Sequence, residues 1–281
     1  MTEQDGLRNG PNYSEALLYY PLEAPSPIPV VVLIPGFTNS ISAIQDWGPF
    51  LASYGYATFL VNVNSFFEPP FFRSEALLDG IVTIKVENER LGSPLFGMLN
   101  IEDFTVGGYS MGGGGAQIAA TQDSSIKAVI ALAAWLDNPS ITVDNNTSTL
   151  FISGEFDNVA PNNIHTDIFY NNTPEDTDKL LYEISGGFHS TVTSPYNDEE
   201  MGLKTLFWIE KYILNDFSNC DSLITQPSTA STFLTNLDCS IDIIGDITQD
   251  GITNVLDLVL LISWIINGIN PSDQEMELQI L

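Results

Sequence analysis

Residues 104–120 read Phe-Thr-Val-Gly-Gly-Tyr-Ser-Met-Gly-Gly-Gly-Gly-Ala-Gln-Ile-Ala-Ala and contain a G-x-S-x-G pentapeptide centred on Ser110. An apolar run precedes the pentapeptide and small residues follow it, which predicts a strand that turns sharply into a helix. Gly108 and Gly112 would relieve the crowding where the strand reverses. Such a turn presents a serine hydroxyl at a helix N-terminus, so Ser110 is a candidate nucleophile. An ordinary glycine-serine turn is the alternative.

A nucleophilic serine needs a general base, and the chain contains two histidines, His165 and His189. His189 lies in Gly-Gly-Phe-His-Ser, a glycine-bearing loop after the strand-like residues 180–184. Loops at strand ends present catalytic groups in α/β folds, so His189 is the candidate base. His165 falls in the polar segment 162–169, for which we expect a short helix with a solvated histidine.

A carboxylate must orient the base, and in α/β-hydrolases it comes between the serine and the histidine along the chain. Asp157 fits this order, because it follows the apolar run 149–153 and precedes a loop. Asp137, after the apolar run 128–134, is the rival. Either aspartate could be a helix cap or a surface charge. We favour Asp157 because of its position in the expected topology.

The tetrahedral intermediate of acyl transfer needs two N–H donors for its negative oxygen. One donor is the residue after the nucleophile, here Met111, and the other lies in a loop after an early strand. The apolar run 30–34 is typical of a buried parallel strand and ends in a Pro-Gly pair at 35–36. The N–H of Phe37 is therefore the second candidate donor, and a plain strand-ending turn is the alternative.

Apolar runs and helical patterns alternate along the chain, which predicts an α/β fold with a mostly parallel sheet flanked by helices. The expected strands are 30–34, 58–63, 104–107, 128–134, 149–153 and 180–184, and the expected helices lie near 43–53, 74–88, 111–121 and 199–213. The chain order serine, aspartate, histidine is typical of the α/β-hydrolase fold.

Several of these stretches resemble the bacterial polyester hydrolases, the cutinase and poly(ethylene terephthalate) hydrolase family. The matching segments lie within residues 13–240 and are Pro35-Gly36-Phe37-Thr38, Trp47-Gly48-Pro49 with Leu51-Ala52-Ser53, 108–115, Gly154-Glu155-Phe156-Asp157 and Gly186-Gly187-Phe188-His189-Ser190. The resemblance implies an esterase with Ser110, Asp157 and His189 as its triad. It also implies that Phe37 and Met111 are the oxyanion donors.

The resemblance further implies an aromatic clamp that holds an aromatic or acyl unit of the polymer. The matching positions are Phe37 and Trp135, both of which could equally be core aromatics. Val159 and Ser190 match further positions of the cleft. Phe37 stands where relatives often carry tyrosine, and Tyr109 stands where they usually carry histidine or tryptophan.

The chain has 281 residues, with 8 Lys and Arg against 36 Asp and Glu and a net charge of −28. This charge argues against nucleic acid and anionic membranes as partners, because both select basic surfaces. No stretch is long enough to span a membrane. The N-terminus lacks the features of a signal peptide, so we expect that a leader was removed or never present.

The chain has two cysteines, Cys220 and Cys239. The resembling family closes its C-terminus with a disulfide, which implies that these two residues are bonded. Such a bond would indicate an oxidising, extracellular compartment, and two free buried thiols are the alternative.

Residues 246–257 place oxygen-bearing side chains at positions 1, 3, 5, 9 and 12 of a calcium loop, with glycine at position 6. The candidate ligands are Asp246, Thr248, Asp250, Ile252, Asn254 and Asp257. An apolar helix should follow, and the segment resembles one repeat of a type I dockerin, which would bind structural Ca²⁺ and a cohesin-like partner. Dockerins carry two repeats, and they have Asn or Asp where Thr248 stands. A capping turn before an apolar helix is the alternative.

These observations predict a secreted, monomeric serine esterase with a catalytic domain at 1–240 and a dockerin-like tail at 241–281. It would hydrolyse polyester bonds through an acyl-enzyme and would need no cofactor for catalysis. An esterase that acts on small acyl esters or on acetylated plant polysaccharide is one alternative. A calcium-dependent binding or surface-attachment protein is an alternative from another class.

Overall fold

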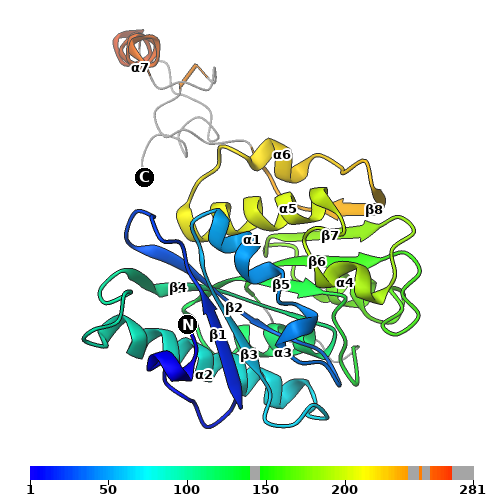
Figure 1. Cartoon of the computed structure of the whole chain (residues 1–281). Coiled ribbons are helices and arrows are strands. Elements are labelled where there is room, and N and C mark those ends of the chain that lie inside the picture. Colours follow the sequence, from blue (N-terminus) through cyan, green and yellow to red (C-terminus); the bar gives the residue numbers. More distant parts are fainter. Residues whose placement is uncertain (140–145, 240–246, 249–253, 268–281) are drawn as a thin grey trace. The chain divides into compact units, whose positions relative to one another are not determined.

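The computed structural model describes residues 1–139, 146–239, 247–248 and 254–267 (Figure 1). The chain divides into two compact units, Met1–Leu237 and Asp238–Leu281. The first unit contains Ser110, Asp157 and His189.

A sheet of eight strands forms the centre of the first unit, in the order β1-β3-β2-β4-β5-β6-β7-β8. The strands are β1 (Glu15–Tyr19), β2 (Ile28–Ile34), β3 (Ala57–Asn62), β4 (Leu99–Tyr109), β5 (Ile126–Leu132), β6 (Ser148–Gly154), β7 (Lys179–Ile184) and β8 (Ala230–Thr235). The strands from β3 to β7 in that order pair in parallel. The edge strands β1 and β8 pair antiparallel with their neighbours. The predicted fold, a mostly parallel sheet of the α/β-hydrolase type, is confirmed.

Helices cover both faces of the sheet (Figure 1). They are α1 (Trp47–Ser53), α2 (Pro70–Glu89), α3 (Met111–Ala120), α4 (Thr166–Asn172), α5 (Glu199–Ile209) and α6 (Cys220–Ile224), with the 3-10 turns η1 (Glu3–Asp5), η2 (Ile41–Ala43) and η3 (His189–Thr193) and the π-helical turn η4 (Glu210–Leu214). Helices α1 and α5 lie on one side of the sheet, and α2 and α3 lie on the other (Figure 1).

The two faces of the sheet carry separate cores, because successive side chains of a strand point to opposite faces. In β2, Val31 belongs to the core that contains Trp47 of α1 and Trp208 of α5. The next residue, Val32, belongs to the core that contains Leu77 of α2. Every residue of β2 is buried, so its continuous apolar sequence follows from burial on both sides.

The two edge strands were not predicted from the sequence. In β1 and β8, polar residues interrupt the apolar ones, and part of each strand faces solvent. Neither strand therefore forms the continuous apolar run that marked the buried strands. Helix α2 begins earlier than predicted, at Pro70, because proline is favoured in the first turn of a helix, where its missing N–H costs no hydrogen bond.

Cys220 and Cys239 are disulfide-bonded, which confirms the bond that the family resemblance implied. The bond closes a loop that contains α6 and β8. None of the helices in the described ranges combines the length and the apolar character that crossing a bilayer requires.

In the second unit, two reciprocal capping hydrogen bonds stand at the start of α7 (Val255–Asn267). Asn254 Oδ1 accepts the Leu256 N–H at 2.8 Å, and Asp257 Oδ2 accepts the Asn254 N–H at 2.6 Å. Asp257 Oδ1 also accepts the N–H and the hydroxyl of Thr248, each at 2.9 Å. These hydrogen bonds, led by that from Asn254, lower the pKa of Asp257 to about 2. The described part of this segment therefore has the geometry of a helix cap.

Candidate active site

Ser110 lies between β4 and α3 with φ 56° and ψ −121°. A residue other than glycine at positive φ is strained by about 1–3 kcal/mol, and such strain is common at catalytic positions. A Cβ at Gly108 would lie 2.4 Å from the Gly112 carbonyl carbon, and a Cβ at Gly112 would lie 2.4 Å from the Ile34 oxygen. Only glycine fits at these two positions, so the pentapeptide forms the sharp strand-to-helix turn that its sequence predicts.

His189 and Asp157 are joined by a hydrogen bond of 2.6 Å between Nδ1 and Oδ2. The other carboxylate oxygen of Asp157 accepts the N–H groups of Val159 at 2.9 Å and Ala160 at 2.8 Å. Because the carboxylate is an acceptor, it favours the tautomer with the proton on Nδ1 and leaves Nε2 as the basic nitrogen. The rival Asp137 is exposed, and Asp157 is the aspartate that the fold brings to His189.

The sheet brings the three residues to one edge, because parallel strands end on the same side. Ser110 follows β4, Asp157 comes in the loop after β6, and His189 begins η3 after β7. The loops after β6 and β7 are also bonded to each other. Phe156 N–H donates to Gly187 O at 2.7 Å, which fixes the acid relative to the base.

Tyr109, the residue before the serine, contacts the imidazole. Its ring lies 4.9 Å from the ring of His189, with an angle of 43° between the planes. Burial, and to a smaller extent the Asp157 carboxylate, raises the pKa of Tyr109 to about 12, so this side chain is neutral at physiological pH. No hydrogen bond joins Ser110 Oγ to the imidazole within the described residues. Such bonds are often long before substrate binds.

The loop that carries Phe37 approaches Ser110 closely. A Cβ at Gly36 would lie 2.8 Å from Ser110 Cβ. The N–H groups of Phe37 and Met111 have no acceptor among the residues that the structure describes. Both groups are therefore available to a substrate oxygen, as the sequence predicts for oxyanion donors.

Arg73, a buried residue of α2, holds this loop from behind. Its Nη1 donates to Pro35 O at 2.9 Å, and its Nη2 donates to Phe66 O at 3.2 Å. Phe66 O also accepts the Thr38 N–H at 2.9 Å, so the guanidinium secures the loop on both sides of Phe37. Burial lowers the pKa of Arg73 to about 10, which leaves the guanidinium charged at neutral pH. Sequence analysis missed this residue, since the bonded segments are far apart along the chain.

The predicted clamp residues lie around this site. Phe37 and Val159 are exposed, and the backbone N–H of Trp135 donates to Ser110 O at 2.9 Å. The indole of Trp135 is half-buried and lies 5.8 Å from the ring of His165.

The prediction of a solvated His165 was wrong, because this side chain is only 5% exposed. It precedes α4, and its ring also lies 6.1 Å from the ring of Phe169. The imidazole Nδ1 has no hydrogen-bond partner in the described part of the chain, and burial lowers the pKa of His165, so the ring is neutral at physiological pH. The polar residues around His165 in the sequence hid its packing against two aromatic rings.

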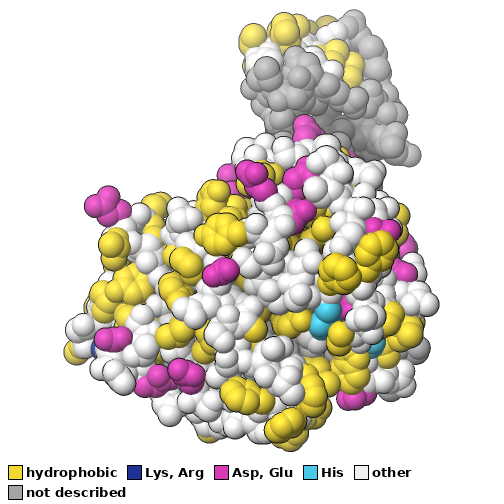
Figure 2. Space-filling model, turned by 45° about the vertical axis from the view of Figure 1, so that its right-hand side comes forward, with side chains coloured by type: hydrophobic (Ala, Val, Ile, Leu, Met, Phe, Trp, Pro, Cys, Tyr) yellow, Lys and Arg dark blue, Asp and Glu magenta, His cyan; other side chains and the backbone are white. Residues whose placement is uncertain are grey.

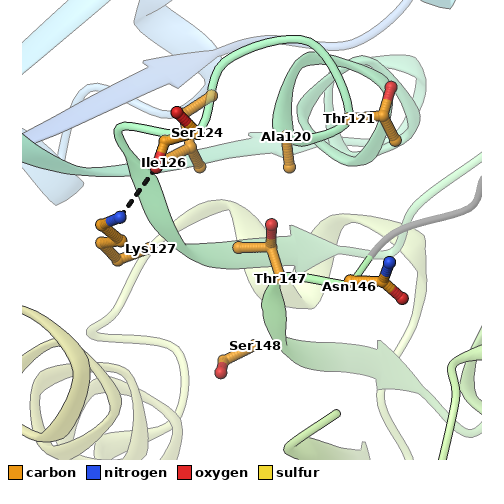
Figure 3. A pocket seen from close by; sticks show the side chains of 8 residues that line it. All are labelled: Ala120, Thr121, Ser124, Ile126, Lys127, Asn146, Thr147 and Ser148. Atoms are coloured by element: carbon orange, nitrogen blue, oxygen red, sulfur yellow. Dashed lines mark hydrogen bonds between the residues drawn. The ribbon is translucent and has the colours of Figure 1, made fainter.

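A cavity of about 380 Å³ lies elsewhere on the first unit (Figure 3). It is lined by Ala120, Thr121, Ser124, Ile126, Lys127, Asn146, Thr147 and Ser148. This lining comes from the end of α3 and the amino ends of β5 and β6, whereas the candidate triad lies at the carboxyl ends of strands. The cavity is therefore not part of the candidate active site.

The predicted calcium ligands Asp246, Asp250 and Ile252 lie outside the described residues. Asp257, which is described, already uses both carboxylate oxygens as hydrogen-bond acceptors for Thr248 and Asn254. Within the described ranges, no group of three or more His, Cys, Asp or Glu side chains is arranged to hold a metal ion. The contacts of Asp257 are those of the capping alternative.

Known proteins are similar in sequence to most of this chain. Residues 3–239 match the family described as PETase, PET hydrolase-like. The chain is 28% identical over 233 residues to cutinase est2 of Thermobifida alba, covering 82% of this chain and 74% of that protein. It is 28% identical over 217 residues to Lipase 1 of Moraxella sp. (strain TA144), covering 76% and 65%.

A third relative is the bis(hydroxyethyl) terephthalate hydrolase of Streptomyces coelicolor (strain ATCC BAA-471 / A3(2) / M145), which is 30% identical over 201 residues. That alignment covers 71% of this chain and 62% of the relative. The matched part thus spans slightly less than two thirds of the Moraxella and Streptomyces proteins. Because the family match extends over nearly all of the first unit, this chain belongs to the PET hydrolase-like family of ester hydrolases.

Proposed function

We propose that this protein is a serine esterase that cleaves the ester bonds of polyesters, with Ser110, His189 and Asp157 as its catalytic residues. The observation that carries the proposal is the 2.6 Å bond between His189 and Asp157, at the same edge of the sheet as a serine held in a strained turn. An imidazole oriented by a buried carboxylate is the general base that a serine nucleophile requires.

In the first half of the reaction, His189 Nε2 takes the proton of Ser110 as Oγ attacks the ester carbonyl carbon. The carbonyl oxygen becomes an oxyanion and accepts the N–H groups of Phe37 and Met111. The intermediate then breaks its bond to the alcohol oxygen, which leaves with the proton from the imidazolium. The product is an acyl-enzyme on Ser110.

In the second half, water replaces the alcohol. His189 Nε2 takes a proton from water as the water oxygen attacks the acyl carbon, and the same two N–H groups stabilise the second oxyanion. The intermediate releases Ser110 Oγ, which recovers its proton from the imidazolium. Asp157 stays ionised throughout and stabilises the positive charge on the ring.

The substrate class is inferred from the relatives and from the groups around Ser110. The relatives are named as cutinases, as a lipase and as a bis(hydroxyethyl) terephthalate hydrolase. Phe37, Trp135 and Val159 supply apolar surface beside the nucleophile, which suits an aromatic or aliphatic acyl unit.

The test is product release from an amorphous poly(ethylene terephthalate) film, run beside hydrolysis of a soluble nitrophenyl ester. We expect the native protein to act on both substrates. Asp157→Asn should lower kcat by about 10⁴-fold, and Ser110→Ala should lower it by about 10⁶-fold. The matched control is Asp137→Asn, which removes the exposed rival aspartate and should leave kcat unchanged. Hydrolysis of the soluble ester alone would favour a small-ester or acetyl-polysaccharide esterase, and inactivity on both would favour a binding protein.

We also propose that the protein works outside the cell. The Cys220–Cys239 disulfide supports this location, since such bonds persist in oxidising compartments. An extracellular enzyme would meet polymers that cannot enter a cell.

The tail at 241–281 is proposed to act apart from the chemistry, as a calcium-dependent attachment segment that could take a cohesin-like partner. The support is the spacing of its oxygen-bearing residues, and the cap at Asp257 is the competing explanation. Calorimetric titration of Ca²⁺ into the native chain and into Asp246→Ala/Asp250→Ala decides between them. Binding that the double variant loses, with soluble-ester hydrolysis unchanged, supports attachment, whereas no binding to the native chain leaves a helix cap.

A further inference from the structure

Exposed phenylalanines occur in the segments that adjoin the candidate active site. We call this group the phenylalanine rim, and its members are Phe37, Phe66, Phe67, Phe71, Phe72, Phe156 and Phe188. Their side chains are between 43% and 71% exposed. Single exposed apolar residues are common on proteins, but a group of large exposed aromatic side chains near a site indicates a surface that binds an apolar ligand or partner.

One half of the rim continues directly from the oxyanion loop. The ring of Phe67 packs edge to face on Phe37, with centroids 5.7 Å apart. Phe66 is tied to the same loop, because its carbonyl accepts the Thr38 N–H. Phe71 and Phe72 follow on the first turn of α2, with their rings 5.7 Å apart. This half therefore places exposed aromatic rings on the oxyanion loop, on the segment bonded to it and on the first turn of α2.

The other half lies beside the acid and the base. Phe156 directly precedes Asp157, and Phe188 directly precedes His189. Their rings contact each other, with centroids 6.2 Å apart and an angle of 56° between the planes. Exposed aromatic rings therefore lie beside the oxyanion loop and also beside the acid and the base.

Charge limits what can cover the rim. The chain carries a net charge of −28, and the ionisable residues next to rim residues in the sequence are Glu68, Arg73, Glu155, Asp157 and His189. Hydrophobic side chains gather on both sides of the histidine atoms in Figure 2, whereas Lys and Arg are almost absent from that face. Nucleic acid and anionic lipid surfaces are repelled by such a protein. The complementary partner is uncharged and apolar.

We propose that the phenylalanine rim adsorbs the protein to the surface of a water-insoluble polyester, beyond the few units that occupy the active site. The inference rests on the proposed function and deepens it, because a small soluble ester bound at Ser110 has no need of Phe71 and Phe72. A solid polyester offers uncharged aromatic and aliphatic surface, which matches the rim in chemistry.

The test measures adsorption to poly(ethylene terephthalate) particles with Ser110→Ala as the background, so that binding is separated from hydrolysis. Phe71→Ser/Phe72→Ser removes two exposed rings that have no part in the proposed chemistry. The matched control is Val82→Ser/Val86→Ser, which removes two exposed apolar side chains further along the same helix. We expect adsorption about ten-fold weaker for the phenylalanine pair and nearly unchanged for the valine pair.

The same pairs in the active chain complete the test. The phenylalanine pair should slow film hydrolysis at low enzyme concentration, while kcat/KM on a soluble nitrophenyl ester and Tm stay near native values. The inference would be overturned if the phenylalanine pair adsorbed as well as the native protein, or if the valine pair lost as much adsorption as the phenylalanine pair. Either result would leave the proposed function intact. Rim-dependent adsorption by a native protein that releases no product would support the rim and reject the function. Rim-dependent dimers in light scattering, or binding to neutral phosphatidylcholine vesicles without adsorption to polyester, would also overturn the inference.

Discussion

Arg73 carries a positive charge into the interior of the first unit. Among the described residues it forms no ion pair, and its two Nη groups donate to the carbonyls of Pro35 and Phe66 instead. An arginine that bonds only backbone oxygens fixes the course of the chain. The segment it fixes contains Phe37, whose N–H is the proposed second oxyanion donor.

We predict that Arg73→Met lowers kcat on a soluble ester by about ten- to a hundred-fold with little change in KM, because the oxyanion donor is displaced. Arg73→Lys restores part of the loss, since an ammonium can still reach one carbonyl. Inhibition by a boronic acid, which forms a tetrahedral adduct on serine, should weaken in parallel with kcat.

The control for this prediction is Arg8→Gln. Arg8 also contacts α2, with Nη1 2.7 Å from Asp79 Oδ1 and 2.7 Å from Thr83 Oγ1, which lie further along the helix than Arg73. Its loss should affect stability alone. If both arginine variants lose stability and keep the native kcat, Arg73 has only a structural role.

His165 makes stability depend on pH. Burial lowers the pKa of this histidine in the folded protein below its ordinary value of 6.5. Below pH 6.5 the unfolded chain therefore binds more protons than the folded one, and the contribution of neutral His165 to stability is lost as the pH falls. His165→Phe removes this proton uptake and keeps an aromatic ring between Trp135 and Phe169.

We therefore expect urea unfolding to show a larger loss of stability between pH 7 and pH 5 in the native protein than in His165→Phe. The difference between the two proteins isolates His165, because all other titrating groups are shared. Parallel pH curves would mean that His165 is protonated in the folded state as readily as in the unfolded state.

At the residue level, the candidate triad and oxyanion donors could be proposed from the sequence because each follows a recognisable strand or turn. Ser110, Asp157 and His189 carry their signals within a few neighbouring residues. The roles of Arg73 and His165 arise from contacts between distant segments, such as the 38 positions between Arg73 and Pro35. No local pattern contains such information.

At the level of elements, α3 is unusual because four successive glycines occupy its first two turns. A Cβ at Gly115 would lie 2.8 Å from Arg73 Cβ and 2.9 Å from Pro70 O. The small residues thus let α2 and α3 approach closely. That approach places Arg73 behind the oxyanion loop.

We predict that Gly115→Ala destabilises the protein by about 1–2 kcal/mol, although alanine favours helix formation by about 1 kcal/mol relative to glycine. The clash with α2 should outweigh the gain in propensity. Urea unfolding measures the change. A stabilised variant would show that the two helices have room to separate.

The two edge strands that the sequence analysis missed show which strands a hydrophobic pattern does not detect. A central parallel strand is buried on both faces and reads as one apolar run, as β2 does. The strands β1 and β8 have one neighbour each, and their exposed positions accept polar residues. Their pairing with β3 and β7 is a tertiary contact that the local sequence does not specify.

At the scale of the whole molecule, the disulfide holds the C-terminal part of the fold. The loop between Cys220 and Cys239 includes β8, which pairs with β7, the strand that leads to His189. We predict that Cys220→Ser/Cys239→Ser lowers the free energy of unfolding by about 3 kcal/mol, mainly because the unfolded chain gains freedom. Urea unfolding gives the value.

The reduced native protein provides the control, since it should match the double variant. The double variant itself should be insensitive to reductant. A loss well below 1 kcal/mol in both would mean that the pairing of β8 alone fixes this part of the chain.

The bond between Phe156 N–H and Gly187 O has a consequence for engineering. Because the loops that follow β6 and β7 are bonded to each other, a new loop grafted after one strand must accommodate the backbone of the other. Exchanging one loop alone would break the partnership of acid and base even with both side chains retained. The two loops therefore act as one structural unit, and variants of this active site should be built by transplanting both loops together.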